Sequence, residues 1–276
     1  MAIITTTVRP LPRLIRTPTF RRFTSVLTFL FPFACLISAW WWLASTNYYP
    51  RNFLPAPLAV FEALADKLQD GTLQKHVSAS MGRLGLGIVV SLFMGVGFGM
   101  IMGLSRGVAE FFEPLTSFLN ALSGIAWVPL AIVWFGLGQG AVTFILWNAI
   151  FFLVMFNTLL GVKAVPRVFM NAVLTMGGGK WRVIRDVMLP GAMPNIILGV
   201  RMGIGFGWRA LIAAEMIGAT SGLGFMIFDA SYFHRTDVIM AGILVIGVIW
   251  LVTDRLILIP LERRTIERWG LINVPT

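Results

Sequence analysis

Residues 171–190 read NAVLTMGGGKWRVIRDVMLP and lie between two long apolar runs, at about 140–160 and 194–217. The segment is basic, and three consecutive glycines divide it into two short amphipathic stretches. Pro190 is expected to stop the second stretch before the next apolar run begins. So regular an apolar face is unusual for a solvated loop of this length, and it predicts a docking surface for another protein on a membrane-embedded chain.

The composition places the chain in a lipid bilayer. Of the 276 residues, 57% are hydrophobic and only 12% are charged, and the mean hydropathy is +0.83. Several nearly uncharged windows have the length of about 20 residues that a helix needs to cross roughly 30 Å of hydrocarbon. We therefore predict an all-α polytopic membrane protein with about six transmembrane helices. The predicted spans are 24–45, 83–104, 115–135, 140–160, 194–217 and 238–259.

The net charge of +10 is explained by membrane topology. The loops and tails on one side of the predicted bundle carry 14 Lys and Arg residues, and those on the other side carry four. The larger group is Arg9, Arg13, Arg16, Arg21, Arg22, Arg106, Lys163, Arg167, Lys180, Arg182, Arg185, Arg263, Arg264 and Arg268, and the smaller is Arg51, Lys67, Lys75 and Arg235. The positive-inside rule then places both termini and segment 161–193 in the cytoplasm, with some contact to anionic membrane lipid. No nucleic acid partner is expected.

Three regions follow from this topology. A basic cytoplasmic arm occupies residues 1–24, a single transmembrane domain occupies 25–260 and includes the cytoplasmic segment 161–193, and a cytoplasmic tail occupies 261–276. The first apolar run is longer than the hydrophobic core of a signal peptide and ends in the aromatic residues Trp40, Trp41 and Trp42. We therefore predict a retained helix.

The second and fifth spans carry glycines four residues apart, which allows a neighbouring helix to approach closely. The fifth span also holds Arg201, Arg209 and Glu215, and Glu215 is the acid nearest to Arg209 in that span. Ionisable residues at such depth are costly. Either these three line a water-filled translocation path, or the arginines snorkel to the interface or form ion pairs within the bundle.

The third span contains Pro129, which is expected to kink the helix and free a carbonyl group. Kinks of this kind often line a path. Trp127 and Trp134 flank the proline, and they either contact a solute or pack as interfacial anchors.

Sites for nucleotides, metals and catalysis are not expected in this chain. A phosphate-binding loop ending at Gly179 and Lys180 would need glycine at Leu174 and Ser or Thr at Trp181. The two histidines lie far apart in sequence, and Cys35 is the only cysteine. We therefore predict that the chain is not an enzyme and binds no cofactor itself.

The segment at 171–190 resembles the cytoplasmic loop of the inner-membrane permeases of bacterial ABC importers. That loop carries Glu-Ala-Ala, three residues, Gly, nine residues and then Ile-x-Leu-Pro. Here Asn171, Ala172 and Val173 are followed by Gly177 and by residues 187–190, so the spacing is kept. Asn171 stands where the family has glutamate, and a charge contact made by that glutamate is lost.

Further segments are similar to the nitrate, sulfonate, taurine and bicarbonate branch of that family, and within it they look most like the taurine and alkanesulfonate members. They occur in the family's order from about residue 50 onward. These segments are FLPAPLAVFEAL at 53–64, GIAWVPLAIVWFGLG at 124–138, LPGAMPNIILGVRMGIGFGW at 189–208, AAEMIGATSGLGFMI at 213–227 and Thr236-Asp237-Val238.

The resemblance implies a multi-pass protein of the bacterial inner membrane with the fold of a type I ABC importer permease. Two cytoplasmic ABC ATPase subunits, which bind ATP and Mg, would dock on the loop, a periplasmic solute-binding protein would deliver the solute, and a second permease copy would complete the path. Alternating access would move a small anion inward. The residues expected to couple to the ATPase are Asn171, Ala172, Gly177, Lys180, Trp181, Arg182, Ile184, Arg185, Leu189 and Pro190. Those expected on the path are Trp127, Pro129, Trp134, Arg201, Arg209 and Glu215.

Two other classes are compatible with a polytopic chain. A secondary transporter or channel without an ATPase partner would have no use for the spaced motif, and no inverted repeat is visible. A membrane anchor of an enzyme complex would need haem or quinone ligands, and paired intramembrane histidines are missing from the sequence.

Overall fold

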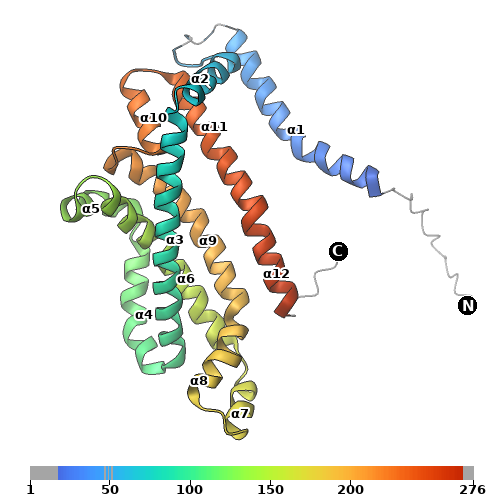
Figure 1. Ribbon diagram of the computed structural model, residues 1–276, viewed down its shortest axis with the longest axis vertical. Helices are drawn as coiled ribbons and strands as arrows, with labels where there is room; N and C mark the ends of the chain where they lie inside the picture. Colours follow the sequence, from blue (N-terminus) through green and yellow to red (C-terminus); the bar gives the residue numbers. More distant parts are fainter. Residues whose placement is uncertain (1–17, 47, 49, 51, 270–276) are drawn as a thin grey trace, which may run out of the picture. The chain divides into compact units, whose positions relative to one another are not determined.

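A computed structural model describes residues 18–46, 48, 50 and 52–269, and every regular element in this part of the chain is a helix (Figure 1). The chain forms two compact units, residues 1–59 and 60–276, which we describe separately. Most of the predicted N-terminal arm and the last seven residues of the predicted tail lie outside the described residues.

In the first unit, helix α1 runs from Pro18 to Ser45 and contains the predicted first span. Its apolar portion with described side chains is Phe31–Ser45. The indole N–H of Trp40 donates to the carbonyl of Pro55 at 3.1 Å, which ties the end of α1 to the segment before α2 (Pro57–Gln69).

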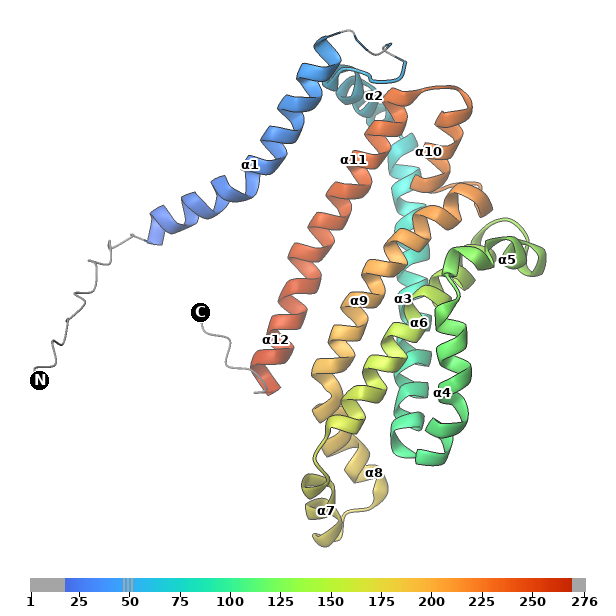
Figure 2. The same ribbon diagram turned by 180° about the vertical axis from the view of Figure 1, so that it is seen from behind.

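The second unit has α6 (Gln139–Ala164) at its centre, with α3 (Thr72–Leu104) and α9 (Leu189–Gly218) packed along it (Figures 1 and 2). Four helices in the described chain are long and apolar enough to span a membrane: Thr72–Leu104, Gln139–Ala164, Lys180–Gly218 and Thr236–Thr265. They contain the predicted spans two, four, five and six. The remaining elements are α4 (Arg106–Ala121), η1 (Gly124–Trp127), α5 (Val128–Phe135), α7 (Arg167–Thr175), α8 (Lys180–Val183), η2 (Ile184–Met188), α10 (Leu223–Tyr232), α11 (Thr236–Thr253), η3 (Asp254–Leu258) and α12 (Ile259–Trp269).

The predicted third span is a broken element. The two helices Arg106–Ala121 and Gly124–Phe135 meet at 85°, so they count at most as one interrupted span. The kink expected at Pro129 is wrong, because this residue lies in the first turn of α5, where its missing N–H has no helical partner to lose. The break occurs at Leu122 and Ser123, whose ψ angles of 121° and 132° end the helical path of α4.

Glycines on α3 and α9 allow both helices to approach α6, as the four-residue spacing predicted. The closest approach to backbone on α3 is at Gly99, where a Cβ atom would lie 2.6 Å from the carbonyl oxygen of Met155 on α6. On α9, a Cβ at Gly199 would lie 2.6 Å from the Cβ of Asn157. These distances are shorter than any ordinary side-chain contact, so the helix packing depends on glycine at both positions.

We expect Gly99→Ala to destabilise the folded chain, although alanine is the better helix former. The new methyl group must displace the backbone of α6, and overpacking of this kind costs about 1–3 kcal/mol. Gly97 is the matched control, because it lies two residues before Gly99 on the same helix and has nothing within 4 Å of its Cβ position. Gly97→Ala should raise stability by about 0.5–1 kcal/mol. Thermal unfolding of both variants in detergent measures the difference, and equal melting temperatures would contradict the packing.

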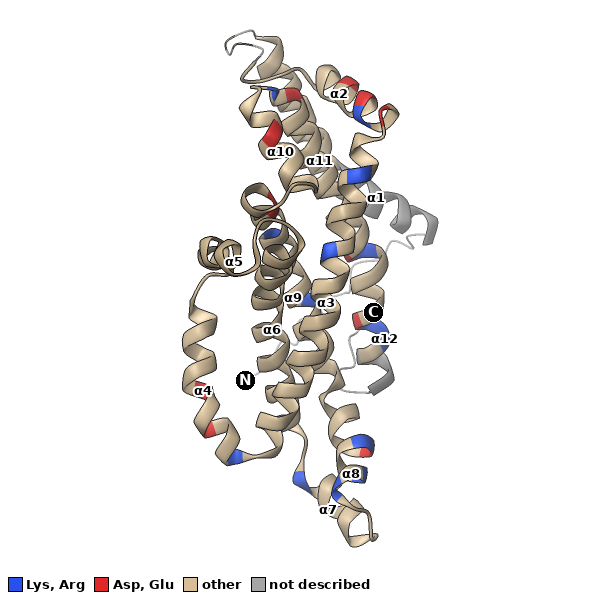
Figure 3. Cartoon of the chain, turned by 60° about the vertical axis from the view of Figure 1, so that its left-hand side comes forward, with Lys and Arg blue, Asp and Glu red and all other residues tan. Residues whose placement is uncertain are grey.

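Basic residues, coloured blue in Figure 3, gather at the end of the second unit that carries α7 and α8, whereas acidic residues, coloured red, are prominent on α2 and α10. The basic end holds Lys163, Arg167, Lys180, Arg182 and Arg185. This distribution agrees with a cytoplasmic location of the α7–α8 end.

Candidate functional site

Residues 167–188, which we call the coupling hairpin after the ATPase contact that the resemblance implies, are closed by a glycine in the left-handed region. Gly177 has a φ of +81°, and its N–H donates to the carbonyl of Leu174 at 3.0 Å. The N–H of Gly178 donates to the carbonyl of Val173 at 2.9 Å. These two bonds form a Schellman motif, which ends α7 and favours glycine at position 177. The spacing of the sequence motif therefore has a structural cause.

The next glycine is required for a different reason. Gly178 is buried, and a Cβ there would lie 2.5 Å from Cγ1 of Val173 and 2.8 Å from the carbonyl oxygen of Val173. The close approach turns the chain back, so that α8 begins at Lys180 beside α7.

The expectation that Pro190 stops the second stretch is wrong. The helix continues from Lys180 to Gly218 over 39 residues, and Pro190 lies within it. A π-helical turn at Ile184–Met188 ends two residues before the proline. Because Pro190 has no N–H to donate to the preceding turn, a local change of hydrogen-bond register accommodates it. The second stretch of the hairpin and the fifth span are consequently one continuous helix.

The side chains of the coupling hairpin divide into a buried and an exposed apolar set. Val183 and Met188 are buried, and Ile184 is half-buried against the same core. Trp181 does not belong to this buried set, because it is 72% exposed. The other strongly exposed apolar side chains of the hairpin are Val168, Phe169, Leu174 and Met176. Such a concentration at the tip of a hairpin favours contact with another protein.

The predicted coupling residues all lie in the hairpin or at the start of α9. Asn171, Ala172, Gly177, Lys180, Trp181, Arg182 and Arg185 are exposed, and Ile184, Leu189 and Pro190 are half-buried.

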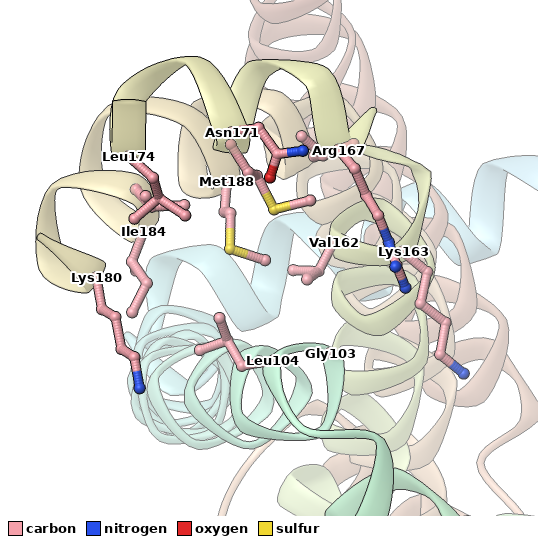
Figure 4. A pocket seen from close by; sticks show the side chains of 13 residues that line it. Gly103, Leu104, Val162, Lys163, Arg167, Asn171, Leu174, Lys180, Ile184 and Met188 are labelled. Carbon is pink, nitrogen blue, oxygen red and sulfur yellow. The ribbon is translucent and has the colours of Figure 1, made fainter. Parts of the chain in front are cut away.

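A pocket of about 670 Å³ separates the hairpin from the inner ends of α3 and α6 (Figure 4). Its polar lining consists of Lys163, Arg167, Lys180 and Asn171, and no Asp or Glu lines it. The side chain of Asn171 makes no hydrogen bond with the described residues, whereas its carbonyl accepts the hydroxyl of Thr175 at 3.1 Å. A glutamate at position 171 would have faced these three cations.

At the other end of α9, the carboxylate of Glu215 is fully buried and paired with Arg83 from α3. Arg83 Nη1 lies 2.8 Å from Glu215 Oε1, and the guanidinium is itself almost fully buried. Ser80 Oγ lies 2.8 and 2.9 Å from the two carboxylate oxygens and donates to the carboxylate. The N–H of Gly224 donates to Oε2 at 3.0 Å.

The loop between α9 and α10 wraps around this ion pair. Arg83 donates to the carbonyl of Ser221 at 2.6 Å and to its hydroxyl at 2.8 Å. Gly222 has a φ of +117°, and a Cβ there would lie 2.3 Å from the carboxyl carbon of Glu215. Glu215 is the acid nearest to Arg209 in sequence, but its carboxylate is occupied by Arg83, Ser80 and the N–H of Gly224.

Arg201 forms ion pairs within the bundle. Its guanidinium bonds Asp254, at 3.3 Å, and Glu262. These partners lie in η3 and α12, so the pairs fasten the C-terminal helix to the inner half of α9. Ion pairing, one of the two alternatives for an intramembrane arginine, is realised at this position.

Arg209 differs from both of these arginines. Its side chain is exposed, and its guanidinium lies 5.6 Å from the ring centroid of Phe206. In the described part of the chain, no carboxylate lies within ion-pairing distance of it.

The aromatic residues around the break of α4 and α5 pack on one another. Trp127 and Trp134 lie 6.4 Å apart, and each contacts Phe144 of α6, at 6.1 and 5.9 Å. Pro129 and Trp134 are exposed. Packing, the alternative to solute contact, accounts for the ring contacts of both tryptophans.

Residues 95–264 match the family model described as the binding-protein-dependent transport system inner membrane component, which covers more than half of the chain. The chain belongs to this family of ABC importer permeases. The permease is thus a multi-pass protein of the inner membrane, in agreement with the resemblance of the coupling hairpin.

Relatives of the permease fall in the nitrate, sulfonate, taurine and bicarbonate branch. The permease is 38% identical to the taurine transport system permease protein TauC of Escherichia coli K12, covering 78% of this chain and 80% of TauC. It is 29% identical to the putative aliphatic sulfonates transport permease protein SsuC of Bacillus subtilis 168, covering 85% of this chain and 84% of SsuC. It is 30% identical to the bicarbonate transport system permease protein CmpB of Synechococcus elongatus, covering 85% of this chain and 86% of CmpB.

A solved structure supports the fold. The permease resembles a chain of the inward-facing MetNI methionine ABC transporter with a TM-score of 0.54 and 14% sequence identity, over 68% of this chain and 95% of that chain. The predicted all-helical, type I importer fold is confirmed.

Sequence reasoning missed Arg83, Ser80 and Ser221 in the permease. Arg83 lies at the start of the predicted second span, where we treated it as the boundary of an apolar window. A charge within an apolar run was the available signal, because an intramembrane arginine requires a partner. The partner, Glu215, is 132 residues away, and no periodicity links the two positions.

We expect Asn171→Glu to be tolerated by the permease and to raise its stability slightly. The new carboxylate would face Lys163, Arg167 and Lys180 across the pocket (Figure 4). Ion pairs at exposed positions contribute about 0–1 kcal/mol, so the shift in melting temperature should be small and should shrink at high salt. Thermal unfolding at low and high salt checks this, with Asn171→Gln as the uncharged control. A loss of stability would show that position 171 is not surrounded by positive charge.

Proposed function

We propose that the permease is the membrane subunit of an ATP-driven importer that moves a small anion of the taurine or alkanesulfonate, nitrate or bicarbonate class into the cytoplasm. Separate ABC ATPase subunits, two per complex, would bind ATP and Mg. A periplasmic solute-binding protein would deliver the anion. The names of the relatives TauC, SsuC and CmpB support this substrate class.

The observation that carries the proposal is the continuous helix from Lys180 to Gly218. Its inner end belongs to the coupling hairpin, which exposes Trp181 and Met176. Its outer end holds Glu215 in the buried ion pair with Arg83. Movement of an ATPase bound to the hairpin would therefore be transmitted along one helix to the outer half of the bundle, as alternating access requires.

The path is proposed to run between two copies of the permease. Within one copy, we assign Arg209 to this path together with Trp127, Pro129 and Trp134 at the broken span, since Arg209, Pro129 and Trp134 are exposed. Glu215 and Arg201 were also expected on the path, but their ion pairs support a role in holding the bundle together.

Reconstitution tests the proposed function. The permease is coexpressed with an ABC ATPase and a binding protein encoded beside it, and the complex is placed in liposomes. We expect copurification of the ATPase and uptake that requires ATP on the ATPase side and loaded binding protein on the other. Taurine, ethanesulfonate, nitrate and bicarbonate are compared as solutes. Uptake driven by an ion gradient without ATP would instead identify a secondary transporter.

A further inference from the structure

A cavity of about 470 Å³ lies where the break between α4 and α5 meets α6 and α9. Its polar lining comprises Asn120 and Ser123 at the break, Asn148 on α6 and Arg209 on α9. No Asp or Glu lines the cavity. Its volume is within the range of about 300–1,000 Å³ that is typical of small-molecule sites.

Arg209 brings an unbalanced positive charge to this cavity. Two other arginines of the membrane-spanning helices, Arg83 and Arg201, are each paired with carboxylates. Arg209 has no such partner among the described residues and instead lies over the Phe206 ring, an arrangement that favours a cation but does not neutralise it. An unpaired cation within membrane-spanning helices is costly, and its position in a cavity indicates a counter-ion supplied from outside the chain.

Asn148 places a buried polar side chain against the same cavity. Its side chain is only 7% exposed, yet its amide forms no hydrogen bond with the described part of the chain. The amide is directed towards the break, since Asn148 Oδ1 lies 3.6 Å from the Cβ position of Gly124, another residue of the cavity wall. Buried polar groups in native proteins are almost always satisfied, and one that faces a cavity is available to a ligand.

We propose that this cavity is an oxyanion subsite, in which the Arg209 guanidinium pairs with a sulfonate, nitrate or bicarbonate group and the Asn148 amide donates to one of its oxygens. Guanidinium groups bind such oxygens with paired, charge-assisted hydrogen bonds. Because the cavity has no carboxylate, it recognises the oxyanion and has no counter-ion for the ammonium group of an amino-sulfonate. The inference rests on the proposed import of an anion and assigns the residues that select it.

The test uses the complete complex in liposomes with its binding protein. Arg209→Gln should lower the rate of anion uptake at least tenfold, whereas Arg209→Lys should retain part of it. Asn148→Asp, which is nearly isosteric but places a negative charge beside the anion, should lower uptake more than Asn148→Ser, which removes the amide without adding charge. Taurine and ethanesulfonate should be affected equally by each change, because the subsite does not bind the ammonium group. Arg106→Gln is the control, since Arg106 is an exposed arginine remote from the cavity.

A purely structural role would produce a different pattern. It predicts that Arg209→Gln lowers the melting temperature and ATPase copurification together, and that Asn148→Asp and Asn148→Ser do not differ in uptake. That pattern, or uptake by Arg209→Gln within twofold of the unmodified complex, would overturn the subsite. Failure of the proposed function is distinguishable, because the unmodified complex would then lack ATP-dependent uptake of every anion tested.

Discussion

Glu215→Ala is expected to prevent the permease from accumulating as a folded protein. The change leaves the guanidinium of Arg83 buried without its carboxylate, together with the hydroxyl of Ser80 and the N–H of Gly224. Removing one partner of a buried ion pair costs about 3–5 kcal/mol, a large part of the stability of a typical domain. Fluorescence-detected size-exclusion chromatography after heating would measure the loss as a lower yield and a lower melting temperature.

The matched control is Glu110→Ala, which breaks the exposed ion pair with Arg106. The two atoms that form this pair are 2.7 Å apart, closer than in the buried pair, but both side chains are mostly exposed. Surface pairs contribute about 0–1 kcal/mol, so this variant should behave almost like the unmodified chain. If Glu215→Ala and Glu110→Ala had the same small effect, the buried network would not hold the outer end of the bundle.

Trp181→Asp is expected to abolish ATP-driven uptake while the permease remains folded. Trp181 is 72% exposed at the tip of the coupling hairpin, so its loss leaves no cavity in the core. A large aromatic side chain at the centre of an interface typically contributes 2 kcal/mol or more, about a 30-fold change in affinity, and a carboxylate there adds a desolvation cost. Copurification of the ATPase and uptake in liposomes are the two measurements.

Trp181→Phe is the control for this change, because it keeps an apolar aromatic group at the same position and should retain most of the coupling. Ile184→Asp is a poorer test of the contact, since Ile184 is half-buried and packs against the core beside Met188. Normal copurification and normal coupled ATPase activity of Trp181→Asp would show that the ATPase binds elsewhere.

The elements that sequence predicted well are those determined by local spacing. The three glycines at 177–179 predicted the division of the segment, which the structure places at the left-handed Gly177. The glycine repeats of α3 and α9 predicted close helix packing. Apolar runs of sufficient length likewise identified the four continuous spans.

Two kinds of feature were not predicted from the sequence. One depends on contacts between distant segments, and the other occurs where a proline is compatible with two backbone conformations. The pairing of Arg83 with Glu215 joins α3 to α9, and only the assembled bundle brings them together. Pro190 was compatible either with a helix end or with a π-turn inside a longer helix, and the packing of Val183 and Met188 favours the second. Pro129 likewise was compatible with a kink inside a helix or with the first turn of a new helix. The structure has the second arrangement, and the chain breaks earlier, at Leu122 and Ser123.

The helix from Lys180 to Gly218 is long enough to serve as a lever in the proposed transport cycle. Its 39 residues correspond to a length of about 58 Å at a rise of 1.5 Å per residue. A tilt of roughly 5° about one end would displace the other end by about 5 Å, close to the pitch of one helical turn. A displacement of that size is comparable to the width of a small oxyanion, so a modest rotation imposed at the cytoplasmic tip is geometrically sufficient to open or close a passage for one.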